Sequence, residues 1–241
     1  MKKWKRIAYL PLVLLIFFTM STAAYGDLYW ESEMISAGRP AGLPGNLPKQ
    51  MLDQFNKTET IKCYLTSYAY RTDTSDGIMI IEYDTMMMYD LNIKDKTYTK
   101  INVASSMDNE RGKGMMAELA EEMKITPTNE TKKIAGYMCK KYNMTIMGGN
   151  SEFWISKDVK GYKEYAAFGK KMEKMSEKNP MMKKMGMAGK WDGFPVQTVT
   201  NVMGITTTST LKTIEEKTLS KDLFEIPKGY KMLDIEAPPY Q

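Results

Sequence analysis

Alternating apolar and polar positions dominate the chain beyond its first 26 residues. Ile61, Cys63 and Leu65 alternate with Lys62 and Tyr64, which is the period of a strand with one buried face. Similar stretches rich in β-branched, aromatic and Met residues follow at 78–83, 86–91 and 97–103. Because only short turn-like segments separate them, we expect these strands to pair as an antiparallel meander.

Two later stretches carry apolar residues at helical spacing instead. The first covers residues 107–124, where Met and Leu recur among Glu and Lys. The second covers residues 161–178, with apolar residues three and four apart and lysines on the other face. Strand-like patterns resume between and after these stretches, at 131–134, 137–146, 152–155, 196–203 and 205–212. The pattern predicts one α+β domain with a mostly antiparallel sheet and two helical segments.

The first 26 residues differ from the rest. A basic start with Lys2, Lys3, Lys5 and Arg6 precedes an apolar run over residues 7–20, and small residues follow it. This is the layout of a secretory signal peptide, and the run is shorter than the roughly twenty residues that span a bilayer. We therefore expect cleavage before Asp27 and export to the periplasm or exterior. No cysteine lies near the cut, so we expect no lipid anchor.

The expected organisation has four parts. A cleaved signal peptide is followed by an N-terminal strand with a Pro/Gly-rich strap, then by a single domain, then by a loose tail. Their bounds are 1–26, 27–57, 58–232 and 233–241.

Charge and composition narrow the function. Four of the 34 basic residues lie in the predicted signal peptide, which leaves 30 against 29 acidic residues. Such a balance argues against a nucleic-acid partner, since phosphate binding needs a basic excess. The chain has no histidine, which removes the commonest general base and metal ligand. We expect neither an enzyme nor a cofactor.

Two cysteines, Cys63 and Cys139, lie in a chain that is predicted to be exported. An even number in an oxidising compartment favours a disulfide. The alternative is a pair of unpaired, buried thiols that pack as small hydrophobic groups.

Methionine is enriched, with 23 residues in the chain. Three uses compete: a pliable apolar cavity, simple packing in helices and core, and a Cu(I) site built from soft thioethers. The candidate copper ligands are Met181, Met182, Met185 and Met187. Dispersion of methionines through the predicted strands disfavours copper, because a metal site needs only a few ligands.

Several motifs resemble a known family. Residues 131–142 read TKKIAGYMCKKY and are followed by Glu152-Phe153-Trp154-Ile155. Related hairpin and terminal motifs occur at Met88-Tyr89-Asp90-Leu91, Lys96-Thr97-Tyr98, Gly193-Phe194-Pro195-Val196 and Leu223-Phe224-Glu225-Ile226-Pro227-Lys228-Gly229-Tyr230. Over most of residues 58–230 the chain resembles the exported bacterial domain-of-unknown-function family 4412. That family is similar in pattern to lipoprotein-carrier-like half-barrels. The resemblance implies a strongly curved sheet wrapping around helices, whose concave side can hold an acyl chain, and it implies no catalytic activity.

These observations predict a non-catalytic extracytoplasmic protein that buries an apolar or amphiphilic ligand, such as a lipid or a lipid-anchored partner. The expected lining combines Met and aromatic side chains: Met86, Met88, Tyr89, Tyr165, Phe168, Met172 and Met175. One alternative is a Cu(I)-binding protein, and another is an envelope interaction or scaffold protein without a small ligand. The lysine-flanked helix could also lie on an anionic membrane surface.

Overall fold

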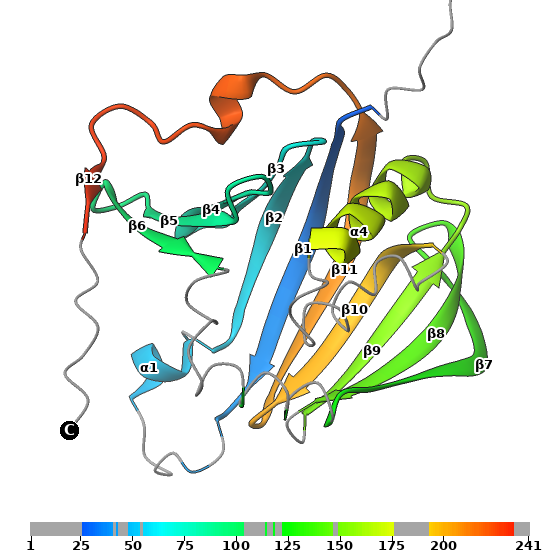
Figure 1. The fold of residues 1–241 in the computed structure, drawn as a ribbon. Helices are drawn as coiled ribbons and strands as arrows, with labels where there is room; N and C mark the ends of the chain where they lie inside the picture. The colour runs from blue at the N-terminus through cyan, green and yellow to red at the C-terminus, as the bar shows by residue number, and fades with distance from the viewer. Residues whose placement is uncertain are drawn as a thin grey trace, which may run out of the picture.

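A computed structural model describes residues 26–40, 42, 48–53, 55–103, 114, 118, 122–146, 149–175 and 193–233. Its strands form one curved, open sheet in the order β12-β6-β5-β4-β3-β2-β1-β11-β10-β9-β8-β7 (Figure 1). Every neighbouring pair is antiparallel except β12 and β6, which run parallel. The mostly antiparallel, curved sheet agrees with the predicted fold class.

The bounds of the strands follow the alternation in the sequence. They are β1 (Leu28–Gly38), β2 (Lys57–Leu65), β3 (Ala69–Asp73), β4 (Gly77–Glu82), β5 (Met87–Asn92), β6 (Thr97–Asn102), β7 (Lys124–Ile134), β8 (Tyr137–Ile146), β9 (Gly149–Ser156), β10 (Phe194–Val202), β11 (Ile205–Glu216) and β12 (Lys231–Met232). The predicted meander is confirmed for β4, β5 and β6, which pair consecutively, but β3 was not predicted and lies between β2 and β4.

Strand β1 lies in the middle of the sheet. It pairs with β2 on one side and with β11 on the other, so a segment near the N-terminus joins strands from both ends of the chain. Leu28 is fully buried and Trp30 is 8% exposed. The centre of the sheet therefore depends on a contact between residues about 180 positions apart in the sequence.

Helix α4 (Tyr162–Met175) lies across one face of the sheet (Figure 1), within the stretch predicted at 161–178. Gly161 precedes it with a φ of +82°, and a Cβ there would clash with Leu28. A glycine is therefore needed where the chain turns into the helix against β1. The short helix α1 (Lys49–Asp53) lies elsewhere. The helix predicted at 107–124 falls mostly outside the described residues.

The helix-side core is the larger of two main apolar clusters. Its buried members include Leu28, Trp30, Leu65 and Phe194, and α4 adds Tyr162, Tyr165 and Phe168 to it. Apolar residues of α4 recur three and four positions apart, so one face of the helix can pack on the sheet.

The outer core lies on the opposite face of β3 to β5. Its buried members are Ala69, Ile78, Ile80, Leu91, Leu219 and Phe224. The last two belong to a segment that we call the C-terminal strap, residues 217–233, which includes a 3-10 turn at Lys221–Phe224. The strap ends as β12 beside β6 (Figure 1), where the Leu233 amide donates to the Tyr98 carbonyl at 2.7 Å.

The predicted disulfide is wrong, since Cys63 and Cys139 are both buried, unpaired thiols. Cys63 lies on β2 and Cys139 on β8, and four strands stand between them in the sheet. Both side chains pack in the helix-side core, as small hydrophobic groups do. Burial raises the pKa of the Cys63 thiol to about 11.

Within the described residues, no helix is long and apolar enough to cross a membrane.

Candidate functional site

We call strands β3 to β6 the arm. On the helix side of the arm, the side chains change from apolar to polar with distance from the centre of the sheet. Cross-strand partners share a face, so the register aligns Trp30, Cys63, Thr72, Met79, Asp90 and Thr99 in one row. The row begins with buried side chains under α4 and ends with polar ones at β5 and β6. Within the part of the chain that the structure describes, the arm is thus left open where the helix-side core ends.

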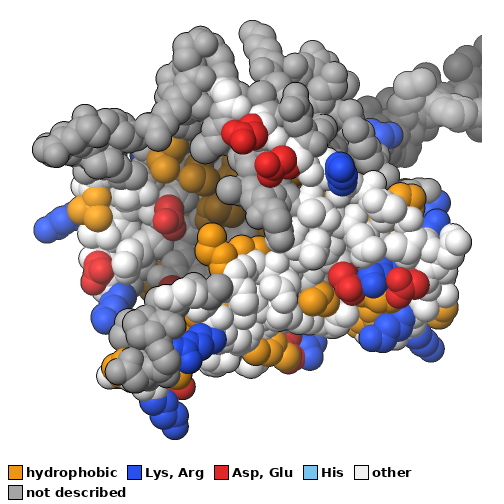
Figure 2. Space-filling view, turned by 90° about the horizontal axis from the view of Figure 1, so that it is seen from below, with side chains coloured by type: hydrophobic (Ala, Val, Ile, Leu, Met, Phe, Trp, Pro, Cys, Tyr) orange, Lys and Arg blue, Asp and Glu red, His pale blue; other side chains and the backbone are white. Residues whose placement is uncertain are grey.

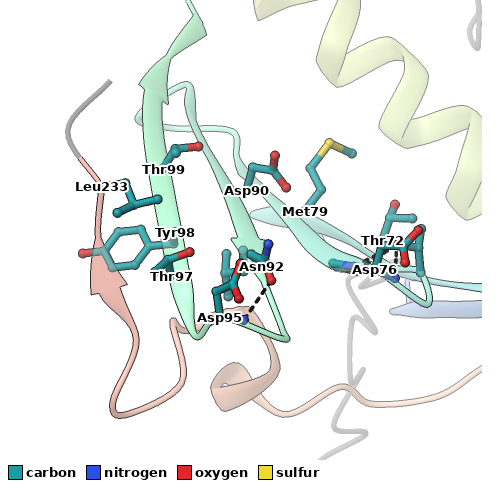
Figure 3. A pocket seen from close by; sticks show the side chains of 13 residues that line it. Thr72, Asp76, Met79, Asp90, Asn92, Asp95, Thr97, Tyr98, Thr99 and Leu233 are labelled. Atoms are coloured by element: carbon teal, nitrogen blue, oxygen red, sulfur yellow. Dashed lines mark hydrogen bonds between the residues drawn. The ribbon is translucent and has the colours of Figure 1, made fainter. Parts of the chain in front are cut away.

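A groove of about 600 Å³ occupies this open part of the arm. It is lined by Thr72, Thr74, Asp76, Gly77, Met79, Asp90, Leu91, Asn92, Asp95, Thr97, Tyr98, Thr99 and Leu233. Figure 3 shows Met79 and Asp90 pointing toward the side on which α4 lies. Leu233, at the end of the strap, closes the groove beside Tyr98 (Figure 3).

The charged side chains of the groove are acidic. Among the described residues, its lining includes three carboxylates, from Asp76, Asp90 and Asp95, and no lysine or arginine. The Lys57 ammonium reaches Asp76 from β2 at 3.0 Å. The Asp95 amide donates to the Asn92 side chain at 3.0 Å, which fixes the β5–β6 turn. A ligand with a cationic or hydrogen-bond-donating group suits this surface better than an anion does.

An apolar row runs beside the groove. The register aligns Leu28, Leu65, Tyr70, Ile81, Met88 and Ile101. The first two are buried, whereas Ile81, Met88 and Ile101 are only partly covered. Viewed from below, the molecule has a recess in which hydrophobic side chains gather (Figure 2). The arm therefore offers an apolar strip next to a polar groove.

Under α4, in contrast, aromatic side chains fill the space. The Tyr165 ring lies 4.8 Å from Phe194 and 6.3 Å from Trp30. Phe168 packs 6.1 Å from Tyr70 and 5.3 Å from Tyr83. Burial raises the pKa of Tyr165 to about 12 and that of Tyr70 well above its usual value. These rings pack with one another, so this part of the face is core.

A smaller cavity of about 230 Å³ remains at the edge of that core. Phe168 and Leu65 line it together with Thr66, Ser67 and Glu164. Phe168 is thus the predicted lining residue that borders both core and cavity.

The other predicted lining residues are scattered. Met88 lies on the helix side of the arm, but Tyr89 points to the opposite face and packs against the outer core. We correct the prediction for Tyr89: neighbours in a strand face opposite ways, so Met88 and Tyr89 cannot line one surface. Met86 lies in the β4–β5 turn with a φ of +53°. Met172 and Met175 belong to α4, but their side chains lie outside the described residues.

Metal binding finds no support in the described part of the chain. There, no group of three or more Cys, Asp or Glu residues is placed to hold a metal ion. The four methionines predicted as copper ligands, residues 181–187, lie outside the described residues.

Residue pattern alone did not indicate Met79, Asp90 or the threonines of the groove. One signal was present, because Asp90 interrupts an apolar strand at a position that faces the same side as Met88. Its meaning depends on which face of β5 the helix covers, and spacing alone does not give that.

Comparisons with known proteins give one firm result. The sequence matches the domain of unknown function DUF4412 over residues 49–230. No curated protein matches it.

Solved structures show only loose likeness. PNGF-II in a C2 crystal form is 14% identical with a TM-score of 0.39, and the match covers 84% of this chain and 30% of that one. In a P21 form the values are 11%, 0.38, 85% and 31%. A domain from Vibrio parahaemolyticus, described as an outer membrane lipoprotein-sorting protein, is 11% identical with a TM-score of 0.37, covering 84% and 90%. The chain spans about a third of PNGF-II, and these scores carry no argument about function.

Proposed function

Because the chain belongs to the DUF4412 family of unknown function, we propose from its geometry that it is a non-catalytic binding protein for an amphiphile. The ligand lies along the helix side of the arm, with its apolar part on the strip and its polar part in the groove. We also propose that the protein is exported, which the predicted signal peptide supports. We propose further that its curved sheet is a half-barrel of the kind that the family resemblance implies.

The observation that carries this proposal is that the apolar strip lies directly beside the polar groove. The strip of Ile81, Met88 and Ile101 is partly uncovered, and Met79 continues it into the groove. Removing such side chains from water stabilises a complex by roughly 25 cal/mol per Å² of apolar area. Polar groups at a few points then orient the ligand, and Asp90 is placed for that role.

Groove size agrees with this assignment. About 600 Å³ falls within the range of roughly 300–1,000 Å³ that small-molecule sites occupy. The three carboxylates favour an amphiphile with a cationic or zwitterionic head over a fatty acid, because two like charges repel in a partly desolvated groove.

Binding of lysophosphatidylcholine tests the proposal. We expect the mature protein to bind this lipid in native mass spectrometry and in a titration of tryptophan fluorescence. Met79→Glu and Met88→Glu should each weaken binding at least about tenfold, because a charge replaces a methionine that the ligand would cover.

Met138→Glu is the matched control. Met138 is 56% exposed on β8, outside the arm, so the same change there should leave binding intact. Equal binding by all three variants, or no binding by the wild type and no lipid co-purified with it, would overturn the proposal.

The two alternative functions stay predictions. The copper site rests on residues 181–187, outside the described part of the chain, and no described feature favours a scaffold role over a binding role.

A further inference from the structure

The hairpin of β7 and β8 bears a basic surface on the far side of the sheet from the arm. Its two-residue turn, Ala135 and Gly136, has φ angles of +49° and +90°. Lys133 pairs with Met138 across the hairpin, so the two side chains share a face. Lys140 lies two residues beyond Met138 on that same face and pairs with Ile155 of β9.

A groove of about 380 Å³ lies on this surface. Ile155, Cys139 and Tyr142 supply apolar lining, whereas Lys140 and Lys157 supply charge. The Lys140 ammonium lies 6.0 Å from the centre of the Tyr142 ring. Among the described lining residues, Asp158 is the one carboxylate. We call Lys133, Met138, Lys140 and Lys157 the basic face.

Met138 makes the basic face more than a charged surface. Its side chain is 56% exposed although lysines flank it. Within the described part of the chain, neither Lys133 nor Lys140 forms an ion pair, whereas Lys141 is held by Glu152 at 3.0 Å and Glu130 at 3.4 Å. The charges of Lys133 and Lys140 are therefore available to a partner.

Positive charge is also concentrated in this part of the sequence. Residues 131–163 contain seven lysines against two carboxylates, although the chain beyond residue 26 is balanced at 30 to 29. The remainder of the protein is consequently acidic. Such a dipole orients a protein toward an anionic surface at low ionic strength.

We propose that the basic face docks on the surface of an anionic phospholipid membrane. Lys133, Lys140 and Lys157 approach the headgroup phosphates, and Met138 enters the boundary between headgroups and acyl chains. Lysines on long stems attract diffuse negative charge, and an apolar side chain among them adds the second interaction that stable membrane contact needs. Residues 131–163 contain no arginine, the residue favoured for bidentate recognition of protein carboxylates. A membrane therefore fits better than an acidic protein.

Cosedimentation with vesicles tests this docking. The probes are vesicles of phosphatidylcholine alone and of phosphatidylcholine mixed with phosphatidylglycerol. We expect binding only to the mixed vesicles, and less of it at high salt. Replacing Lys133, Lys140 and Lys157 by Gln should lower the partition coefficient by at least about tenfold. Met138→Asn should lower it by a smaller factor at any salt concentration.

A matched triple variant keeps the test independent of net charge and folding. Lys94, Lys221 and Lys228 are exposed and lie outside the basic face, and their replacement by Gln removes the same charge. This variant should bind mixed vesicles as the wild type does, and both triple variants should unfold at the same temperature as the wild type. Equal loss in both variants, or none in the first, would overturn the docking. Neither result bears on lysophosphatidylcholine binding in the arm, because the two surfaces share no residue.

Discussion

The arm of β3 to β6 and the wing of β7 to β9 form opposite ends of one sheet but rest on different supports. The strap covers the outer face of the arm, where six residues are buried. In the wing, the described residues give a small cluster with only Met123 and Ile155 buried. A covered outer face lets the arm leave its helix side open and still hold its strands together.

The two ends also differ in charge. Three carboxylates line the groove of the arm, whereas lysines surround the groove of the wing. If the wing docks on an anionic membrane, repulsion keeps the acidic groove away from the headgroups. A ligand in the arm would then remain accessible from the aqueous side.

Replacing Phe224, the aromatic residue that anchors the strap, should give the largest difference in local stability between the arm and the wing. Phe224 is 6% exposed and its ring lies 5.5 Å from Tyr68. We expect Phe224→Ala to lower the free energy of unfolding by about 3–5 kcal/mol, the usual cost of emptying a phenylalanine site. Amide hydrogen exchange should accelerate mainly in β3 to β6.

Phe153→Ala is the counterpart in the wing. Phe153 packs against the small cluster and is only partly buried, so we expect a cost of about 1–2 kcal/mol with faster exchange in β7 to β9. Identical exchange patterns in the two variants would show that arm and wing open as a single unit.

Alkaline pH should destabilise the protein through its two buried cysteines. Burial raises the pKa of Cys63 from 9.0 to about 11, so the unfolded chain ionises first as pH rises. Stability is therefore intact below pH 9 and falls between pH 9 and 11, by up to about 2–3 kcal/mol.

Urea unfolding at a series of pH values measures this loss. Cys63→Ala should flatten the decline between pH 9 and 10, before tyrosines contribute. Cys139→Ala should flatten it as well, because Cys139 is 1% exposed and burial raises its pKa too. A decline that neither substitution changes would contradict a contribution from the buried thiols.

Local pattern predicted the elements well, because alternation and helical spacing are properties of neighbouring residues. Strands β2, β4, β5 and β6 and helix α4 are confirmed for that reason, whereas β3 was not predicted. The central place of β1 was not predicted, since its two partners lie in distant parts of the sequence. The disulfide failed for the same reason: cysteine number says nothing about which strands stand between two thiols.

The site was harder to predict than the fold. Tyr165 and Phe168 were expected to line a cavity, but their spacing is equally that of a helix packed on a core. The structure packs both among rings, and Phe168 also borders the smaller cavity. The groove instead uses Thr72, Met79 and Asp90, which meet only through the register of four strands. Strand register in a twisted sheet is a tertiary property, so residue types alone did not indicate this site.

The smallest expected effects concern one cation at each end. The Arg71 guanidinium binds Asp73 at 2.6 and 2.9 Å and donates to the Leu223 carbonyl of the strap. Arg71→Met leaves that carbonyl and a half-buried carboxylate without a donor, so we expect the free energy of unfolding in urea to fall by about 2 kcal/mol.

Lys141→Met should lower the free energy of unfolding by less than about 1 kcal/mol, because its partners Glu130 and Glu152 are 60% and 41% exposed. The Arg71 and Lys141 side chains are similarly covered, at 12% and 13% exposed. They therefore differ mainly in the groups to which they bind. Equal losses would mean that the strap is not fastened through Arg71, and that packing at Phe224 alone holds it to the arm.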